Sequence, residues 1–302
     1  MTSTATAGSS RTLPGTSCRA FPADNYWHAS VASLPVHGRS NSWISHMSPT
    51  RKLHPDFGPS YGAQPVPYGI PITYVAFSHP KVPVTFDYAS ESDRVRYPLG
   101  NDTKVEGGQW TSGDRHTVIV ETTYCRLYET WLTRKGTTWR AGSGATWDLK
   151  SNALRPAGWT SADAAGLPIL PGLLRYDEVA AGSVDHAIRF TTDVTDRRYV
   201  WPARHQAGSV NDPTYPPMGA RFRLKASYPI ASFRRDTQVV LRAMKTYGLV
   251  LADNGSPWYF QGAQDTRWAE AMLDQLKTIP ASAFEAVDSS KLMVSSTSAQ
   301  SR

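Results

Sequence analysis

The chain has 302 residues, long enough to bury a large core, and its formal net charge of +7 is spread along the chain instead of gathered in a basic run. It contains no P-loop, zinc-finger spacing or RNA-reading motif and no apolar stretch approaching about 18 residues, so neither nucleic-acid binding nor a membrane span is expected. The abundance of Gly, Pro, Trp and Tyr is typical of many short strands joined by turns.

Both ends of the chain are rich in small polar residues. We expect a disordered arm over residues 1–20, a single β-rich domain over 21–288 and a disordered tail over 289–302. The N-terminal segment lacks the apolar core of a signal peptide. The two cysteines, Cys18 and Cys125, form either one disulfide between arm and domain or two free thiols, and the absence of a Cys/His cluster argues against a structural zinc site.

Three consecutive antiparallel strands are predicted between residues 113 and 152. Apolar and polar side chains alternate there with a period of two, which indicates strands with one buried face. Two-residue turns are expected at 122–123 and at 136–137, where Gly136 suits a hairpin turn.

That register predicts a groove on one face of the sheet. His116 lies opposite Glu129, Glu129 lies opposite Gly144, and Trp131 lies opposite Gly142. Glu129 is then a candidate general acid or base whose proton affinity His116 adjusts. The alternative is a cross-strand polar pair on a solvated face.

Asp148 is the second carboxylate predicted on this face. It lies four residues beyond Gly144, roughly 13 Å away at about 3.3 Å per residue. This separation exceeds the roughly 5–5.5 Å of retaining and 6.5–9.5 Å of inverting glycosidases, so the pair is weak evidence for either. Trp131 is a candidate platform for stacking a sugar ring, although most of the tryptophans are expected in the core.

A second hairpin is predicted from Val184–Thr192 and Tyr199–His205. With a turn at 195–196, His186 lies directly across from His205. The two imidazoles are interpreted as buried neighbours, as an acid–base pair, or as two ligands of a metal ion. The carboxylate that would complete such a metal site is Asp114 or Glu178.

The segment Ala153–Tyr176 is a long loop rich in Pro and Gly, which is typical of a functional loop. Further along, basic residues alternate with apolar ones in a predicted strand: Arg221, Arg223 and Lys225. They form either the solvent face of that strand or a cationic strip that binds an acidic substrate such as a uronate polymer.

Two helices are predicted near the C-terminus. Ser232–Tyr247 carries an apolar stripe and is followed by Gly248 as its C-cap. A second helix is expected to begin near Asp265, with Trp268 on its buried side.

Four blocks of the sequence resemble blocks of a family of bacterial proteins, many of them exported, especially from actinomycetes. The blocks are GSGATWDLKSNALRPAGWTSADAAGLPILPGLLRYDEV, DHAIRF, PPMGARFRLKAS and ADNGSPWYF. The resemblance covers roughly residues 20–288 and implies a bacterial, extracytoplasmic setting. It implies no chemistry and therefore no catalytic residue.

The sequence predicts a mainly β single domain, a sandwich or jelly roll, with two C-terminal helices. The expected function is that of a secreted or cell-surface protein acting on a bacterial or plant polysaccharide, as a glycoside hydrolase or polysaccharide lyase. The alternative is a non-catalytic carbohydrate-binding or cell-surface module. A third reading is a metal-dependent enzyme that uses His186 and His205; otherwise no cofactor is expected.

Overall fold

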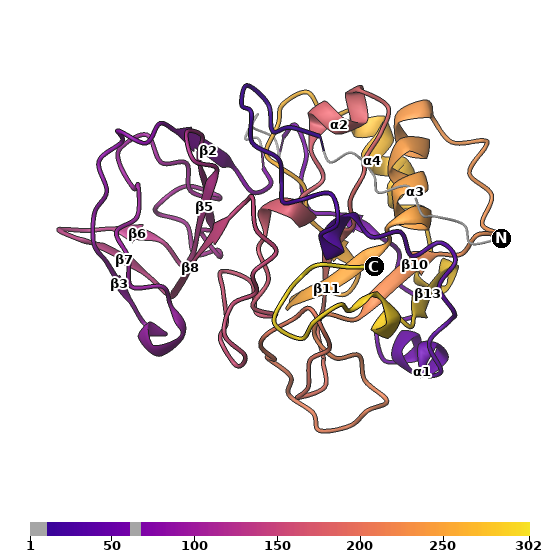
Figure 1. Ribbon diagram of the computed structural model, residues 1–302. Helices are drawn as coiled ribbons and strands as arrows, with labels where there is room; N and C mark the ends of the chain where they lie inside the picture. Colours follow the sequence, from indigo (N-terminus) through magenta and orange to yellow (C-terminus); the bar gives the residue numbers. More distant parts are fainter. Residues whose placement is uncertain (1–10, 61–67) are drawn as a thin grey trace.

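The computed structural model describes residues 11–60 and 68–302, and the chain is mainly β. Its described strands form three sheets of four, three and six strands. Figure 1 shows the two smaller sheets on the left and the six-stranded sheet with most of the helices on the right. We call these parts the sandwich half and the helical half.

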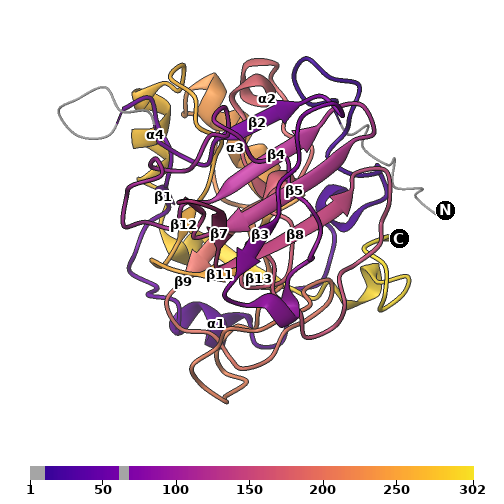
Figure 2. The same ribbon diagram turned by 90° about the vertical axis from the view of Figure 1, so that its left-hand side faces the viewer.

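The sandwich half contains two sheets packed face to face. The four-stranded sheet has the order β2 (Ile72–Val75), β4 (Thr117–Glu121), β5 (Arg126–Trp131) and β8 (Ser143–Asp148). The three-stranded sheet has the order β3 (Val84–Phe86), β7 (Trp139–Ala141) and β6 (Arg134–Lys135). In Figure 2, which faces the sandwich half, β3 passes over the strands of the four-stranded sheet. Ile119 and Tyr128 from the first sheet pack with Phe86 and Trp139 from the second.

The helical half is built on the six-stranded sheet. Its order is β1 (His54–Pro55), β12 (Tyr259–Phe260), β9 (Ile188–Thr192), β11 (Leu249–Asn254), β10 (Arg221–Leu224) and β13 (Phe284–Val287). The α-helices are α1 (Ser40–Ser45), α2 (Tyr176–Ala180), α3 (Arg235–Thr246) and α4 (Glu270–Leu276). The 3-10 helices are η1 (Tyr26–His28), η2 (Ala89–Glu91), η3 (Leu170–Gly172), η4 (Ala281–Ala283) and η5 (Ser290–Leu292).

The two C-terminal helices are present. α3 buries the predicted stripe through Val240, Leu241 and Met244, and Gly248 follows it with a φ of +74°. α4 begins at Glu270, five residues after the expected start. No helix among residues 11–60 and 68–302 combines the length and the apolar character that crossing a membrane requires.

The register of the central strands differs from the prediction. Glu129 pairs with Val118 because the loop between β4 and β5 holds four residues instead of two. On its other side Glu129 pairs with Ala145, one residue away from the predicted Gly144. Because side chains alternate between faces, this shift puts Gly144 and Asp148 on the face opposite Glu129, so the glycine-floored groove was a wrong prediction.

The shift arises where the chain leaves the four-stranded sheet. After β5 the backbone turns at Leu132, whose φ is +53°, and forms the β6–β7 hairpin in the other sheet of the sandwich. It returns at Gly142 to begin β8. The predicted turn at 136–137 therefore joins β6 to β7 and not the two strands that flank Glu129.

The second predicted hairpin is also wrong. β9 lies between β11 and β12, and the segment 199–205 contains only an isolated bridge between Tyr199 and Met218. His186 and His205 therefore do not face each other.

The ends of the described chain are held by specific contacts. Cys18 and Cys125 form a disulfide with an S–S distance of 2.03 Å, which resolves the choice left open by the sequence. Residues 1–10 of the expected arm lie outside the described residues. The tail expected to be disordered from 289 to 302 is instead ordered, because Ser298 bridges Ala153 and Gln300 bridges Asn25.

Candidate active site

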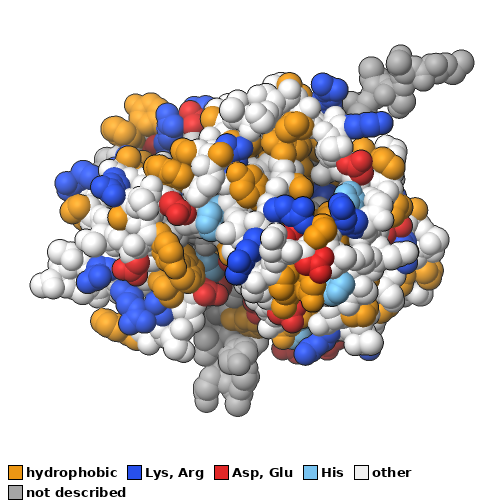
Figure 3. Space-filling view, turned by 90° about the horizontal axis from the view of Figure 1, so that it is seen from below, with side chains coloured by type: hydrophobic (Ala, Val, Ile, Leu, Met, Phe, Trp, Pro, Cys, Tyr) orange, Lys and Arg blue, Asp and Glu red, His pale blue; other side chains and the backbone are white. Residues whose placement is uncertain are grey.

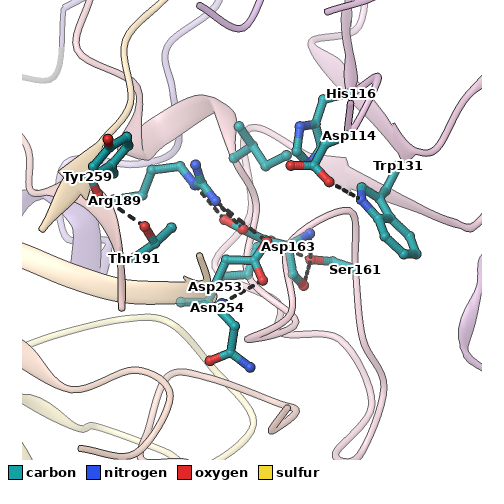
Figure 4. Close-up of polar contacts among 12 residues, drawn as sticks. Asp114, His116, Trp131, Ser161, Asp163, Arg189, Thr191, Asp253, Asn254 and Tyr259 are labelled. Carbon is teal, nitrogen blue, oxygen red and sulfur yellow. Dashed lines mark hydrogen bonds and ion pairs between the residues drawn. The ribbon is translucent and has the colours of Figure 1, made fainter. Parts of the chain in front are cut away.

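A cleft with a volume of about 330 Å³ lies where the two halves meet. The sandwich half contributes Tyr88, Glu91, Asp114 and Trp131, and the helical half contributes His205, Asp253 and Asn254. Residues 160–164, from the loop expected to be functional, lie between them. In Figure 4, Asp114 and Trp131 stand on one side of this space and Asp253 and Asn254 on the other.

Two aromatic side chains lie on the wall formed by the sandwich half. The indole of Trp131, at the end of β5, donates a hydrogen bond from Nε1 to Asp114 Oδ1 at 3.1 Å. Tyr88 is 53% exposed, and the centroid of its ring is 6.2 Å from that of Trp131. Apolar ring faces next to a carboxylate can bind a ligand that is both apolar and polar, such as a sugar.

Asp253 lies near the end of β11, where a buried apolar strand reaches the cleft. About a quarter of its side chain is exposed (24%), and its Oδ1 accepts a hydrogen bond from the backbone N–H of Asn254 at 2.8 Å. The carboxyl of Asp163 is fully buried and contacts the same guanidinium, that of Arg189. Arg189 donates from Nε to Asp163 Oδ2 at 2.7 Å and from Nη2 to Oδ1, and its Nη2 is 3.8 Å from Asp253 Oδ2 (Figure 4).

The environment of Asp253 favours the protonated form of its carboxyl. Desolvation and then the negative charge of Asp163 raise the pKa of Asp253 well above its usual range, and the charge of Arg189 offsets only part of the effect. Asp253 lines the cleft with this raised pKa.

His205 is the predicted histidine that lies in the cleft. Its Nε2 is 3.7 Å from Glu91 Oε2, and its Nδ1 is 2.8 Å from the carbonyl oxygen of Ala164. The structure thus brings together Trp131 and His205 with Asp114, which the sequence suggested only as a metal ligand. Glu91 and Asp253, which also line the cleft, were not singled out from the sequence.

Glu129 lies outside the cleft, which corrects the leading catalytic prediction. Its side chain is fully buried under the loop before α2, and its two oxygens accept the backbone N–H groups of Ile169 (2.8 Å) and Leu170 (2.9 Å). Burial raises the pKa of Glu129 to about 8, although the two N–H bonds oppose the shift. Glu129 holds the start of η3 in place and has no access to a substrate.

His116 is also buried, with 4% exposure, and does not line the cleft. Its Nδ1 is 2.6 Å from Glu106 Oε2. Burial acts to lower the pKa of His116, but the charge of Glu106 and their hydrogen bond outweigh it and raise the pKa to about 9. His116 therefore forms an ion pair with Glu106 and is not the partner of Glu129 that the sequence predicted.

The predicted histidine metal site is not formed. His186 is buried, and its Nε2 is 3.1 Å from Glu178 Oε2, away from His205. Within residues 11–60 and 68–302, no group of three His, Cys, Asp or Glu side chains is arranged to hold a metal ion.

The other predicted site residues point elsewhere. Asp148 pairs with Arg126 at 3.4 Å on the face opposite Glu129. Arg221 is buried, and its guanidinium donates to the carbonyls of Tyr247, Tyr26 and Ala29.

The rest of the predicted cationic strip is also occupied by contacts within the protein. Arg223 pairs with Glu285 at 2.8 Å, and Lys225 donates to the carbonyl of Ser282 at 2.8 Å. None of the three basic residues lines the cleft. Basic side chains on the face shown in Figure 3 are scattered among acidic and apolar ones and form no continuous patch.

Sequence reasoning missed Asp253, Asp163 and Arg189. Asp253 directly follows a continuous apolar run, Leu249–Ala252. An acid at the end of a fully buried strand was the signal that could have found it. Asp163 and Arg189 carried no local signal, because their contact depends on tertiary structure.

No family model, curated protein or solved structure matches the chain.

Proposed function

We propose that the protein is a glycoside hydrolase and that Asp253 is its general acid. The observation that carries this proposal is that Asp253 lines the cleft beside Arg189, which also holds the buried Asp163; burial and then the charge of Asp163 raise the pKa of Asp253. Hydrolysis of a glycosidic bond requires such a group, since the leaving oxygen must be protonated while a second carboxylate assists on the other side of the sugar.

The proposed reaction begins with proton transfer from Asp253 to the glycosidic oxygen as the bond to that oxygen breaks. Arg189, whose Nη2 is 3.8 Å from Asp253 Oδ2, stabilises the negative charge that remains on Asp253. Glu91 and Asp114, on the opposite wall, are the candidates for the second carboxylate, which activates water or attacks the sugar. Trp131 and Tyr88 offer apolar faces against which sugar rings pack.

The charges of the cleft favour a hydrolase over a polysaccharide lyase. A lyase acting on a uronate polymer must bind and neutralise the sugar carboxylate, a task suited to Arg or Lys. The described residues that line the cleft include neither, and three of them are acids: Glu91, Asp114 and Asp253. We therefore propose a neutral polysaccharide or oligosaccharide as the substrate.

A non-catalytic carbohydrate-binding module is the second candidate, because the aromatic pair alone would serve binding. The protonated Asp253 favours the hydrolase, since a binding module has no use for a retained proton.

An exported location is part of the proposal. The Cys18–Cys125 disulfide supports an oxidising compartment, as does the resemblance to exported bacterial proteins. We propose that the protein is secreted or held at the cell surface.

The test is a panel of neutral and uronate polysaccharides, with binding and released reducing ends measured separately. We expect cleavage of a neutral polymer, a loss of about 10²–10⁴-fold in cleavage by Asp253→Asn with binding retained, and weaker binding by Trp131→Ala. Asp148→Asn, on the far side of the sheet, is the matched control and should behave as the wild type. Binding without cleavage by the wild type would establish the module instead.

A further inference from the structure

Asp163 and Arg189 lie behind Asp253 and do not line the cleft. Asp163 is fully buried, in the loop that leads to α2, and its backbone N–H is bound by Ser161 Oγ at 2.9 Å. Arg189 pairs with Asp163, and its Nη2 also lies 3.8 Å from Asp253 Oδ2, so the two carboxyls lie against one guanidinium. Two carboxyl groups this close repel each other when both are ionised in a buried site, so we take the pair to carry one proton.

Arg189 decides which of the two carboxyls is ionised. Its guanidinium makes two charge-assisted hydrogen bonds to Asp163, but approaches Asp253 only to 3.8 Å. A bidentate pair of this kind stabilises the ionised acceptor far more than a single longer contact does. The negative charge therefore stays on the buried Asp163, and the proton stays on the carboxyl that faces the cleft.

The surrounding charges agree with this distribution. On the protein side, Asp253 faces Asp163, Arg189 and His116, and His116 is paired with Glu106. Arg189 and His116 are positive, and Asp163 and Glu106 are negative. Together with Asp253, these side chains therefore have a net charge of zero only while Asp253 is protonated. On the cleft side the charged and titratable neighbours are Glu91, Asp114 and His205.

We infer that Asp163 and Arg189 are positioning residues that keep a proton on Asp253 and hold its carboxyl toward the cleft. The inference rests on the proposed role of Asp253 as general acid. It differs from the shared proton of an aspartic protease, where both carboxyls reach the substrate. Here Asp163 has no exposed surface, and both its oxygens are bound by Arg189.

The test follows the carboxyl carbons of aspartate by ¹³C NMR between pH 3 and 9, and needs no substrate. The Asp253 resonance is identified by its loss in Asp253→Asn. In the wild type we expect Asp253 to titrate well above the exposed aspartates. If no aspartate carboxyl of the wild type titrates above the exposed ones, the inference is overturned without recourse to any variant.

Asp163→Asn supplies the second readout. Replacing the like charge with an amide that donates a hydrogen bond should lower the titration midpoint of Asp253 by about one unit or more. An unchanged midpoint in the folded variant contradicts the inference.

Activity separates this inference from the proposed function. In Asp163→Asn the basic limb of the kcat/KM profile should move to lower pH, whereas a merely structural role would lower kcat without moving the limb. If the NMR midpoints behave as expected but no polysaccharide is cleaved, the proton-holding pair stands and the hydrolase proposal fails.

Discussion

Three acids of the chain show how environment separates residues that look alike in the sequence. Glu129 is sealed in the core and bound by two backbone N–H groups, Asp148 pairs with Arg126 on an outer face, and Asp253 faces the cleft. The sequence predicted that Trp131 and a proton-handling carboxylate share a groove. The carboxylate that it named, Glu129, is buried outside the cleft, because its hydrogen bonds come from Ile169 and Leu170, 40 and 41 residues further along the chain.

At the residue scale we predict that Glu129→Gln lowers stability without abolishing activity. The Gln side chain has one acceptor oxygen for two N–H donors, and its NH₂ group would face one of them, which costs about 1–3 kcal/mol. Urea unfolding should show this loss, while cleavage per folded molecule stays close to that of the wild type. Selective loss of cleavage with unchanged stability would restore Glu129 as the catalytic acid.

At the scale of elements, the positions of strands were easier to predict than their partners. Alternation located β4, β5 and β8, and the apolar stripe located α3. The face that each side chain occupies depended on a single residue at the exit from β5, where the chain crosses to the second sheet. No local pattern distinguishes a hairpin within one sheet from a hairpin that belongs to its neighbour.

The Cys18–Cys125 disulfide gives a prediction at this scale. It links residues separated by 107 positions and ties the N-terminal arm to the loop between β4 and β5. A loop of this length reduces the entropy of the unfolded chain, so the disulfide should contribute roughly 4–5 kcal/mol. Cys18→Ser/Cys125→Ser should unfold at lower urea concentration than the oxidised wild type.

Reductant provides the control for that experiment. It should destabilise the wild type and leave the double variant unchanged. Equal stability of the oxidised wild type and the double variant would show that the disulfide contributes nothing.

At the scale of the whole molecule, the two halves meet through buried charges as well as apolar side chains. His116 and Glu106 come from the sandwich half, and they influence Arg189 and Asp253 of the helical half. The cleft exists because of this meeting, since its walls come from both halves. The sequence predicted neither the packing of the two halves nor the cleft between them, because the periodicity of a segment does not indicate which distant segment packs against it.

Because the pKa values of two buried groups are raised, we expect the free energy of unfolding to fall as the pH becomes alkaline. The pKa of His116 is raised from 6.5 to about 9, so its contribution is complete below pH 6.5 and is lost as the pH rises through about 9. Glu129, with its pKa raised to about 8, acts in the same direction, since the folded state favours its protonated form. The melting temperature should therefore fall between about pH 6.5 and 9.

Glu106→Gln tests the source of that fall. It removes the charge that holds the proton on His116, so the variant should be less stable near pH 6 and should lose less stability on going to pH 9. A melting temperature that is flat from pH 6 to 9 in the wild type would contradict the assignment of these buried pairs.

If Asp253 donates a proton to the leaving oxygen, the loss of activity in Asp253→Asn must depend on the leaving group. Rates are compared for an unactivated oligosaccharide and for an aryl glycoside of the same sugar whose phenol needs no protonation to leave. We expect a loss of about 10²–10⁴-fold on the oligosaccharide and a rate close to that of the wild type on the aryl glycoside. An equal loss on both substrates, or no loss on either, would contradict this role of Asp253.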